Sequence, residues 1–302
     1  MDPGPIVCGT DLLDPADPTV GLAVVLARAL HAQLELVHAL DMADDASPAP
    51  PQIAPALERL AARVKERVEH ARVALEAQRK RIVDGGIRCE AHLEQGRPWE
   101  AVVRRAQETK ASFLVVGPHG PGGGSVAVRS GRTFGRLLGS TADRVVRHAP
   151  CAVLVATFDG PPPVTLERTA WIVGVDFSAP SATAVATACS LARATNGSVT
   201  LARVLTPFED HDEGWAAQVL RIAGPGSDAS VTVGPPIVER GSPAETLAEI
   251  GERTAGAVLV VGTHARTGLS RLVLGSTTEK LLRIARVPVL CVHGDDVAPA
   301  VP

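Results

Sequence analysis

The sequence predicts an α/β protein built from two copies of one doubly wound domain. Each copy is expected to hold an open, mainly parallel five-stranded sheet flanked by helices. Two observations lead to this prediction: short apolar β-branched runs alternate with segments of helical periodicity, and glycine motifs recur at a domain-sized spacing along the 302 residues. Strands that alternate with helices are typical of a parallel sheet covered on both faces.

The composition is that of an ordinary globular chain and excludes several classes of partner. Hydrophobic residues make up 45% and charged residues 21%, enough for a sizeable core in each copy. The net charge of −3 gives no basic surplus, and aromatic residues make up 3%, so we expect no nucleic-acid partner. No apolar run approaches the ~18 residues of a membrane span, so we expect no membrane partner.

The cysteines predict a reducing compartment. They are odd in number, form no C-x-x-C pair, and mostly lie in apolar runs: Cys8, Cys89, Cys151, Cys189 and Cys291. Buried, reduced thiols are therefore the preferred interpretation. The first residues carry no positively charged region of a signal peptide, and we expect a cytoplasmic protein.

An internal repeat divides the chain. The paired motifs are Gly117-Pro118-His119 with Gly262-Thr263-His264, Gly139-Ser140-Thr141 with Gly275-Ser276-Thr277, and Asp11 with Asp176. Their offsets of 145, 136 and 165 differ because the copies differ by insertions. A repeat of this length is a duplicated domain and not a solenoid array.

The predicted organisation has four parts. Domain 1 spans residues 1–157 and domain 2 spans residues 169–293. Residues 158–168 form a linker, whose consecutive prolines at 161–163 favour an extended spacer. Residues 294–302 are rich in Gly, Asp, Ala and Pro and are expected to form a flexible tail.

Each copy gives the same order of elements. In domain 1 we expect Ile6–Gly9, Thr19–His31, Leu34–Ala39, a long helix with a solvated charged face around Ala54–Val83, Arg88–Glu94, Trp99–Thr109, Phe113–Val116, Ser140–His148 and Ala152–Val155. In domain 2 we expect Trp171–Val175, a helix from Ser178 or Ser181 to Thr195, Val199–Val204, Ile237–Glu239, Pro243–Thr254, Ala257–Val261, Ser276–Ile284 and Val289–Val292.

Three features of domain 2 are expected at the carboxyl ends of the strands, where open parallel sheets bind ligands. Asp176 closes the first strand, Gly262 closes the fourth, and Gly275-Ser276-Thr277 begins the last helix. A helix amino terminus suits phosphate, and an acidic side chain suits ribose hydroxyls. Taken singly, Gly262 fits a plain turn, and Ser276-x-x-Glu279 and Ser140-x-x-Asp143 fit capping boxes. Their joint placement, twice over, favours a ligand site.

The chain resembles the universal stress protein family. The residues that carry the resemblance are Val260-Val261-Gly262-Thr263-His264-Ala265-Arg266-Thr267-Gly268-Leu269, Leu274-Gly275-Ser276-Thr277, Val175-Asp176-Phe177-Ser178, Gly241-Ser242-Pro243 and Val287-Pro288-Val289-Leu290. The resemblance covers nearly the whole chain. It implies an adenine nucleotide alpha hydrolase-like fold and a stress-response protein that binds ATP or AMP, with Mg²⁺ left open.

The resemblance also implies site residues. ATP-binding members carry G-x2-G-x9-G-(S/T), which domain 2 matches with Gly262, Ala265 in place of the middle glycine, and Gly275-Ser276. Adenine is expected near Val204 in domain 2 and Ala39 in domain 1, and His264 is expected to pin the loop. The corresponding residues of domain 1 are Asp11, Gly117, Gly120, Gly139, Ser140 and Thr141, with 18 residues between Gly120 and Gly139.

Two other functions remain open beside nucleotide-dependent conformation or assembly. One is slow ATP hydrolysis or phosphoryl transfer, for which Asp176 and His264 are the candidates. The sequence holds no P-loop, zinc cluster or nucleophile elbow, so nothing positive argues for an enzyme or a metal site. The other is a nucleotide-free dimerising scaffold. The resemblance implies pairing through the last strands, Ala152–Val155 and Val289–Val292, either within one chain or in a homodimer.

Overall fold

The computed structural model describes residues 4–13, 17–41, 54–118, 128–130, 133–135, 138–157, 163, 165–206, 214–215, 219, 231–263 and 274–294. For residues 54–58, 60, 128–130 and 133–135, the description covers the backbone alone.

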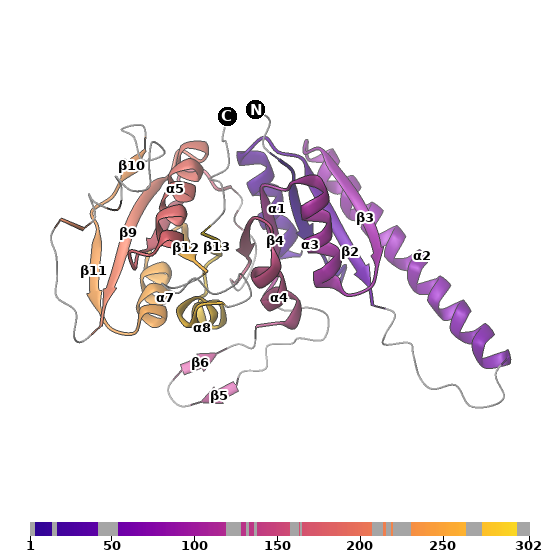
Figure 1. Cartoon of the computed structure of the whole chain (residues 1–302). Helices are drawn as coiled ribbons and strands as arrows, with labels where there is room; N and C mark the ends of the chain where they lie inside the picture. Colours follow the sequence, from indigo (N-terminus) through magenta and orange to yellow (C-terminus); the bar gives the residue numbers. More distant parts are fainter. Residues whose placement is uncertain are drawn as a thin grey trace.

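Domain 1 is a doubly wound α/β unit (Figure 1). Its elements are β1 (Ile6–Gly9), α1 (Pro18–Ala29), β2 (Leu34–Leu40), α2 (Ala54–Asp84), β3 (Cys89–Gln95), α3 (Pro98–Thr109), β4 (Phe113–Val116), β5 (Val128–Ser130), β6 (Thr133–Gly135), α4 (Ser140–His148) and β7 (Ala152–Val155). The strands run parallel in the order β3-β2-β1-β4-β7. The order reverses at β1 and β4, which is where such sheets bind ligands.

Domain 2 repeats this topology. Its elements are β8 (Ala170–Gly174), α5 (Ala179–Ala194), β9 (Ser198–Leu205), β10 (Thr232–Val233), β11 (Ile237–Arg240), α7 (Pro243–Arg253), β12 (Ala257–Gly262), α8 (Ser276–Ile284) and β13 (Val289–Val292). Both β10 and β11 pair with β9 at the sheet edge. Pro235 and Pro236 separate them, and an edge strand breaks there because proline has no N–H to donate.

The two domains form one continuous sheet. Strands β7 and β13 pair antiparallel, with Leu154 opposite Leu290. The Thr157 hydroxyl donates a hydrogen bond to the Val287 carbonyl across the same junction. Of the two pairings that the sequence left open, the structure shows Ala152–Val155 paired with Val289–Val292 within one chain, which gives the chain a pseudo-symmetric arrangement (Figure 1).

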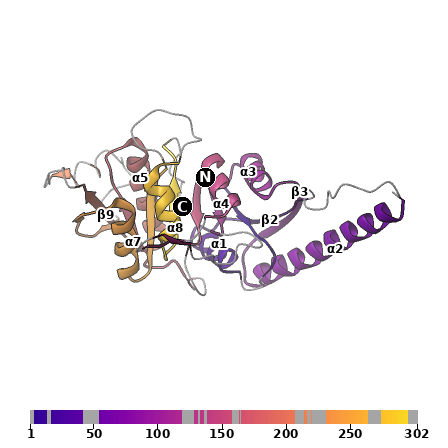
Figure 2. The same ribbon diagram turned by 90° about the horizontal axis from the view of Figure 1, so that it is seen from below.

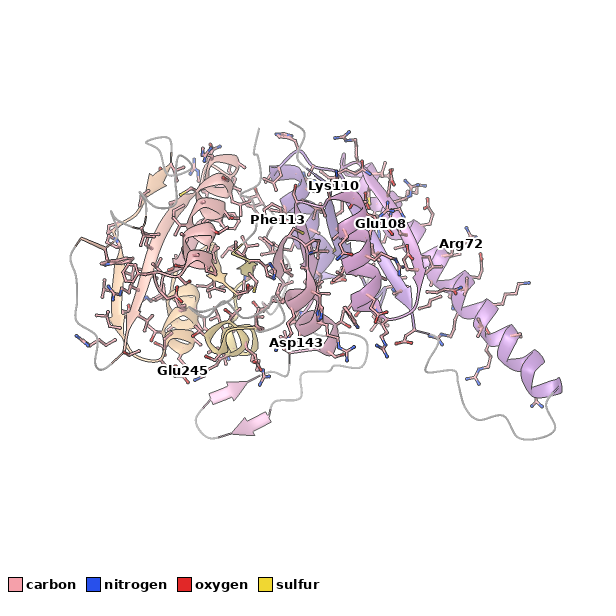
Figure 3. All side chains as sticks on the ribbon, in the orientation of Figure 1. Arg72, Glu108, Lys110, Phe113, Asp143 and Glu245 are labelled. Carbon is pink, nitrogen blue, oxygen red and sulfur yellow. The ribbon has the colours of Figure 1, made fainter. Side chains whose placement is uncertain are left out.

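Helices cover both faces of this sheet. One core cluster joins the sheet to α1, α2 and α5, and the other joins it to α3, α4, α7 and α8. Small aliphatic side chains dominate both clusters, and Phe113, labelled in Figure 3, is a fully buried aromatic residue of β4. Figures 1 and 2 agree that α2 extends beyond the sheet at its amino-terminal end. Its described charged residues are mostly exposed, as predicted for a solvated face.

Capping residues explain where two helices begin. Asp17 precedes α1, and its carboxylate accepts a hydrogen bond from the Thr19 N–H at 2.8 Å. Ser178 precedes α5, and its hydroxyl accepts from the Ser181 N–H at 3.3 Å. Of the two starts that the sequence left open for this helix, Ser178 is therefore the cap. Of the 18 residues between Gly120 and Gly139, the glycine-rich stretch 122–125 lies outside the described residues, and the β5–β6 hairpin was not predicted.

All five cysteines are buried and free of disulfides, in agreement with the preferred interpretation of the sequence. Burial raises the pKa of the Cys291 thiol to about 12, so this thiol is protonated at neutral pH. In the part of the chain that the structure describes, every helix is too short or too polar to cross a lipid bilayer.

Candidate functional site

A cleft of about 280 Å³ opens at the carboxyl ends of β8, β9 and β12 in domain 2. Four residues predicted from the sequence line it: Asp176, Val204, Gly262 and Thr277. The other lining residues are Gly174, Val175, Phe177, Ser178, Ser181, Ala202, Arg203, Thr206, Pro243, Leu247, Val261 and Thr278. The structure therefore brings residues that are 101 positions apart, from Asp176 to Thr277, into one concave site.

Asp176 is held by a tight turn between β8 and α5. Its Oδ1 atom accepts hydrogen bonds from the Ser178 N–H at 2.9 Å and the Ser178 hydroxyl at 2.5 Å. Phe177, between them, adopts the left-handed conformation with φ 63°, which is uncommon for a bulky residue. Both bonds use the same carboxylate oxygen, so Oδ2 takes part in neither.

Gly262 closes β12 because no side chain fits there. A Cβ atom on this residue would lie 2.7 Å from the Pro180 Cβ and 2.9 Å from the Pro180 carbonyl carbon. The glycine thus lets the end of β12 pack directly against the first turn of α5. It is required by packing within the protein, and this requirement holds whether or not a ligand binds.

The loop after β12 is fastened at its base. The Gly275 N–H donates to the Thr263 carbonyl at 2.7 Å, and the Thr278 hydroxyl donates to the Gly262 carbonyl at 2.9 Å. His264 and Ala265 belong to the segment between these anchors and lie outside the described residues. The two bonds fix the start of α8 beside the end of β12.

The capping-box interpretation of the last helices is wrong. Gly275 is the N-cap of α8 and Ser276 is its first helical residue, so Ser276 and Glu279 are not in capping positions. Glu279 instead pairs with Arg283 at 2.6 Å. Gly139 and Ser140 begin α4 in the same way, and Asp143 pairs with Arg147 at 2.9 Å. The first turn of α8 therefore presents its amino terminus, with Thr277, at the cleft.

Phe177 and Arg203 are among the lining residues that the sequence did not single out. The Arg203 guanidinium lies over the Phe177 ring, 4.5 Å from its centroid. The edge of the same ring meets buried Trp215 at a centroid distance of 6.2 Å. Position was the available signal, because Arg203 lies beside Val204 near the carboxyl end of β9, where open parallel sheets bind ligands.

Domain 1 repeats the backbone of this site. Asp11 Oδ1 accepts a hydrogen bond from the Leu13 N–H at 3.0 Å, and Leu12 adopts φ 62°. The Gly139 N–H donates to the Pro118 carbonyl at 2.8 Å, which fastens the equivalent loop.

Asp11 instead lines a cavity of about 590 Å³ against α2, with Leu12, His38, Leu40, Arg67, His70, Ala71, Val73, Ala74 and Ala77. Its described lining includes none of Ala39, Gly117, Gly139, Ser140 and Thr141. Gly120 lies outside the described residues.

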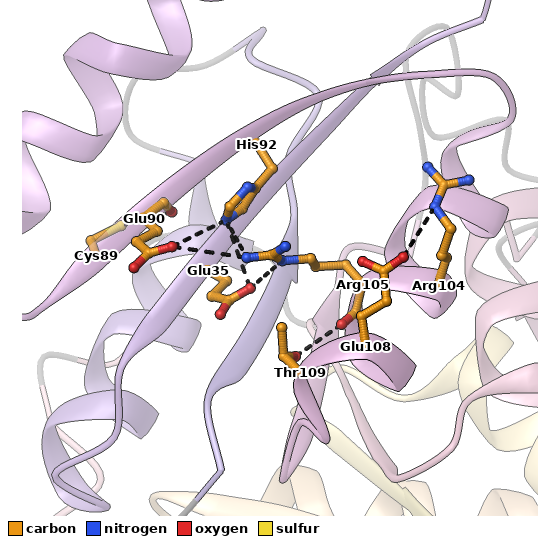
Figure 4. Close-up of polar contacts among 8 residues, drawn as sticks. All are labelled: Glu35, Cys89, Glu90, His92, Arg104, Arg105, Glu108 and Thr109. Carbon is orange, nitrogen blue, oxygen red and sulfur yellow. Dashed lines mark hydrogen bonds and ion pairs between the residues drawn. The ribbon is translucent and has the colours of Figure 1, made fainter.

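A second polar cluster lies on β2, β3 and α3 of domain 1 (Figure 4). Oxygen and nitrogen atoms of Glu35, Glu90 and His92 converge within 4.8 Å, a grouping compatible with a metal ion. Arg105, however, reaches into the group: its Nε donates to Glu35 at 2.5 Å and its Nη2 donates to His92 Nε2 at 2.9 Å. The guanidinium supplies the positive charge that buried Glu35 needs, and the His92 lone pair is already engaged.

Domain 2 has no counterpart of this cluster. At the repeat offsets, Thr200 stands for Glu35, Ile237 for His92 and Ile250 for Arg105. Ile250 is buried in the apolar core of domain 2, and Ile237 packs against that core. The cluster is therefore a feature of how domain 1 is packed and not part of the repeated ligand site.

The fold and the cleft together define a tandem α/β protein with a cleft at the carboxyl ends of parallel strands. The sequence profile described as "Universal stress protein family" matches residues 4–157 and 171–293. The chain therefore belongs to the universal stress protein family.

Individual relatives agree with this assignment. Universal stress protein Rv2623 of Mycobacterium tuberculosis is 31% identical over 175 residues, which are 53% of this chain and 57% of the relative. The chain thus matches little more than half the length of that relative. A Thermus aquaticus universal stress protein is 34% identical over 50% of this chain and 96% of its own length. A solved universal stress protein from Archaeoglobus fulgidus shares the fold over 97% of this chain and 100% of its own, with a TM-score of 0.67 at 17% identity.

Proposed function

We propose that domain 2 binds an adenine nucleotide, AMP or ATP, in the cleft at the ends of β8, β9 and β12, and that binding alters conformation or assembly in a stress response. The observation that carries this proposal is the joint lining of one cleft by Asp176, Val204, Gly262 and Thr277. Family membership supports it, because the G-x2-G-x9-G-(S/T) pattern of ATP-binding members recurs here with alanine at its middle position.

The chemistry of the lining suits each part of the ligand. Val204, Val261 and Leu247 supply apolar surface for a base. The Asp176 carboxylate accepts hydrogen bonds from ribose hydroxyls through Oδ2, because Oδ1 is occupied by Ser178. The amino terminus of α8, with Ser276 and Thr277, provides N–H groups without an intrahelical partner and a partial positive charge for phosphate, whereas the N–H of its N-cap, Gly275, is already bound to the Thr263 carbonyl. Mg²⁺, where ATP is the ligand, would accompany the phosphates.

His264 and Ala265 enter the proposal from the family pattern. They follow Gly262 in the segment that closes the motif, where backbone near the phosphates is expected. The proposal is one of binding: among the described lining residues, Asp176 is the single carboxylate and Arg203 the single cation. Domain 1, with its different cavity beside Asp11, is proposed to bind nucleotide less well or not at all.

Mass spectrometry of small molecules released from the denatured protein tests this function. We expect an adenine nucleotide to be recovered with the wild-type chain and to be depleted from Asp176→Asn. Asparagine keeps an oxygen for Ser178 but replaces the carboxylate that faces the ligand. The matched control is Asp11→Asn in domain 1, which should retain the nucleotide. A wild-type chain that releases no nucleotide and shows no binding of added AMP or ATP would favour the nucleotide-free scaffold.

A further inference from the structure

Arg203 lines the cleft without an anionic partner. In the part of the chain that the structure describes, no carboxylate lies within ion-pair distance of its guanidinium, which rests on the Phe177 ring instead. The side chain is half-buried, so the charge is partly removed from water. A cation–π contact at such a site is weak compared with a charge-assisted hydrogen bond to phosphate. An anion in the cleft is therefore able to draw Arg203 from the ring.

Arg203 lies beside the turn that presents Asp176. Strands β8 and β9 are neighbours, with Gly174 opposite Ala202, and the Val175 N–H donates to the Ala202 carbonyl at 2.9 Å. Arg203 is thus one residue beyond the last paired position, next to the point where Asp176 faces the cleft. The amino terminus of α8, which suits the 5′-phosphates, follows β12 on the other side of β8. The cleft consequently has anion-binding groups on both sides of the ribose position.

Resting on the function proposed above, we infer that this site selects adenine nucleotides that carry a second phosphate on the ribose, at the 2′ or 3′ position. Asp176 accepts a hydrogen bond from the remaining ribose hydroxyl, and Arg203 donates to the ribose phosphate. In dinucleotide folds an acidic residue and an arginine divide the same two tasks between hydroxyl and phosphate. The planar guanidinium fork matches phosphate oxygens in a way that lysine does not.

Domain 1 has neither the phenylalanine nor the arginine at the positions of Phe177 and Arg203, so the two domains can be compared within one chain. Leu12 takes the place of Phe177 in the left-handed turn, and His38 takes the place of Arg203. The His38 Nδ1 atom lies 2.8 Å from the Thr10 carbonyl, so the ring is already held by its own domain. An arginine at this position of the second strand is therefore found in domain 2 and not in domain 1.

Titration calorimetry on the full chain tests the inference with four probes: AMP, ADP, adenosine 2′,5′-bisphosphate and adenosine 3′,5′-bisphosphate. We expect one bisphosphate to bind about tenfold more tightly than AMP, since one charge-assisted contact is gained. ADP controls for added charge at the 5′ end. Arg203→Met should reduce the bisphosphate to the affinity of AMP and leave ADP unchanged. Arg286→Met removes an exposed arginine that precedes β13, at the end of the sheet away from the cleft. This control variant should change neither the bisphosphate affinity nor the ADP affinity.

The outcomes separate this inference from the proposed function. Equal binding of AMP and both bisphosphates by the wild-type chain would overturn the inference and leave nucleotide binding intact. A bisphosphate preference that survives in Arg203→Met would also overturn it. A loss of AMP and ADP binding in that variant would assign Arg203 a general structural role, again against the inference. Absence of binding by all four probes would instead refute the proposed function.

Discussion

Single residues carry both the chemistry and the packing of the cleft. Asp176 and Thr277 were identified from the sequence because one ends a strand and the other begins a helix at the edge where ligands bind, and Val204 was identified from the family resemblance. Phe177 and Arg203 were not identified, because neither residue type is distinctive and their contact depends on a left-handed turn. Gly262 was identified for its closeness to a ligand, yet the structure explains it by contact with Pro180.

Gly262→Ala is expected to destabilise domain 2. The new methyl group would overlap the backbone of Pro180, which cannot move without shifting the start of α5. Overpacking of this kind costs about 1–3 kcal/mol. Urea unfolding of the variant measures the cost, and Gly85→Ala, whose Cβ would meet carbonyl oxygens at 3.3–3.4 Å, is the milder comparison. Equal stability of Gly262→Ala and the wild type would contradict the packing argument.

Cys291 is expected to make stability depend on alkaline pH. Burial raises its pKa from 9.0 to about 12, so the folded chain keeps a proton that the unfolded chain releases. The resulting stabilisation is complete below pH 9 and is lost as the pH rises toward 12, at about 1.4 kcal/mol per pH unit. Chemical unfolding between pH 8 and 10 should show a shallower decline for Cys291→Val than for the wild type. Parallel curves for the two proteins would disprove this role.

At the scale of helices and strands, sequence periodicity was nearly sufficient. The last helix and strand of each domain, such as Ser276–Ile284 and Val289–Val292, have the predicted bounds. Differences arise where side chains or prolines decide the boundary: Asp17 moves the start of α1 to Pro18, and the prolines at 235–236 split the edge strand into β10 and β11. The β5–β6 hairpin was not predicted because strands of three residues leave no periodic signal.

The ion pair between Glu35 and Arg105 joins α3 to β2. Arg105→Ile is expected to lower the unfolding free energy by about 3 kcal/mol, because it leaves the buried Glu35 carboxylate without its cation. The double variant Glu35→Thr with Arg105→Ile copies the residues of domain 2, Thr200 and Ile250, and should recover most of the loss. Thermal unfolding measures both. A double variant less stable than Arg105→Ile alone would refute this account.

At the scale of the whole molecule, the two domains complete each other's sheet. Each would otherwise expose an apolar edge strand, β7 or β13, of the kind that associates with other chains. We expect the domains, when produced separately, to associate with each other, and Leu290→Lys on β13 to weaken that association. Size-exclusion chromatography with light scattering measures the complex. Two domains that remain monomeric when mixed would show that β7–β13 pairing depends on the covalent linker.

The duplication also allows the two sites to differ. Among the described residues, Asp176 of domain 2 lines a cleft with Gly262 and Thr277, whereas Asp11 of domain 1 lines a cavity against α2, and domain 1 also holds the cluster around Arg105. A sequence repeat predicts equivalent backbones, and the turns at Leu12 and Phe177 show that equivalence. It does not predict which residues line the space beside each aspartate, because that depends on the side chains packed around it.

The central claim is that the cleft of domain 2 binds an adenine nucleotide. Titration calorimetry of AMP and ATP into the full chain tests it most directly, because it reports both affinity and stoichiometry. We predict one nucleotide per chain, an affinity at least about tenfold weaker in Asp176→Asn, and an unchanged affinity in Asp11→Asn. Binding that is unaffected by Asp176→Asn, or that is lost in Asp11→Asn, would contradict the claim and move the site elsewhere.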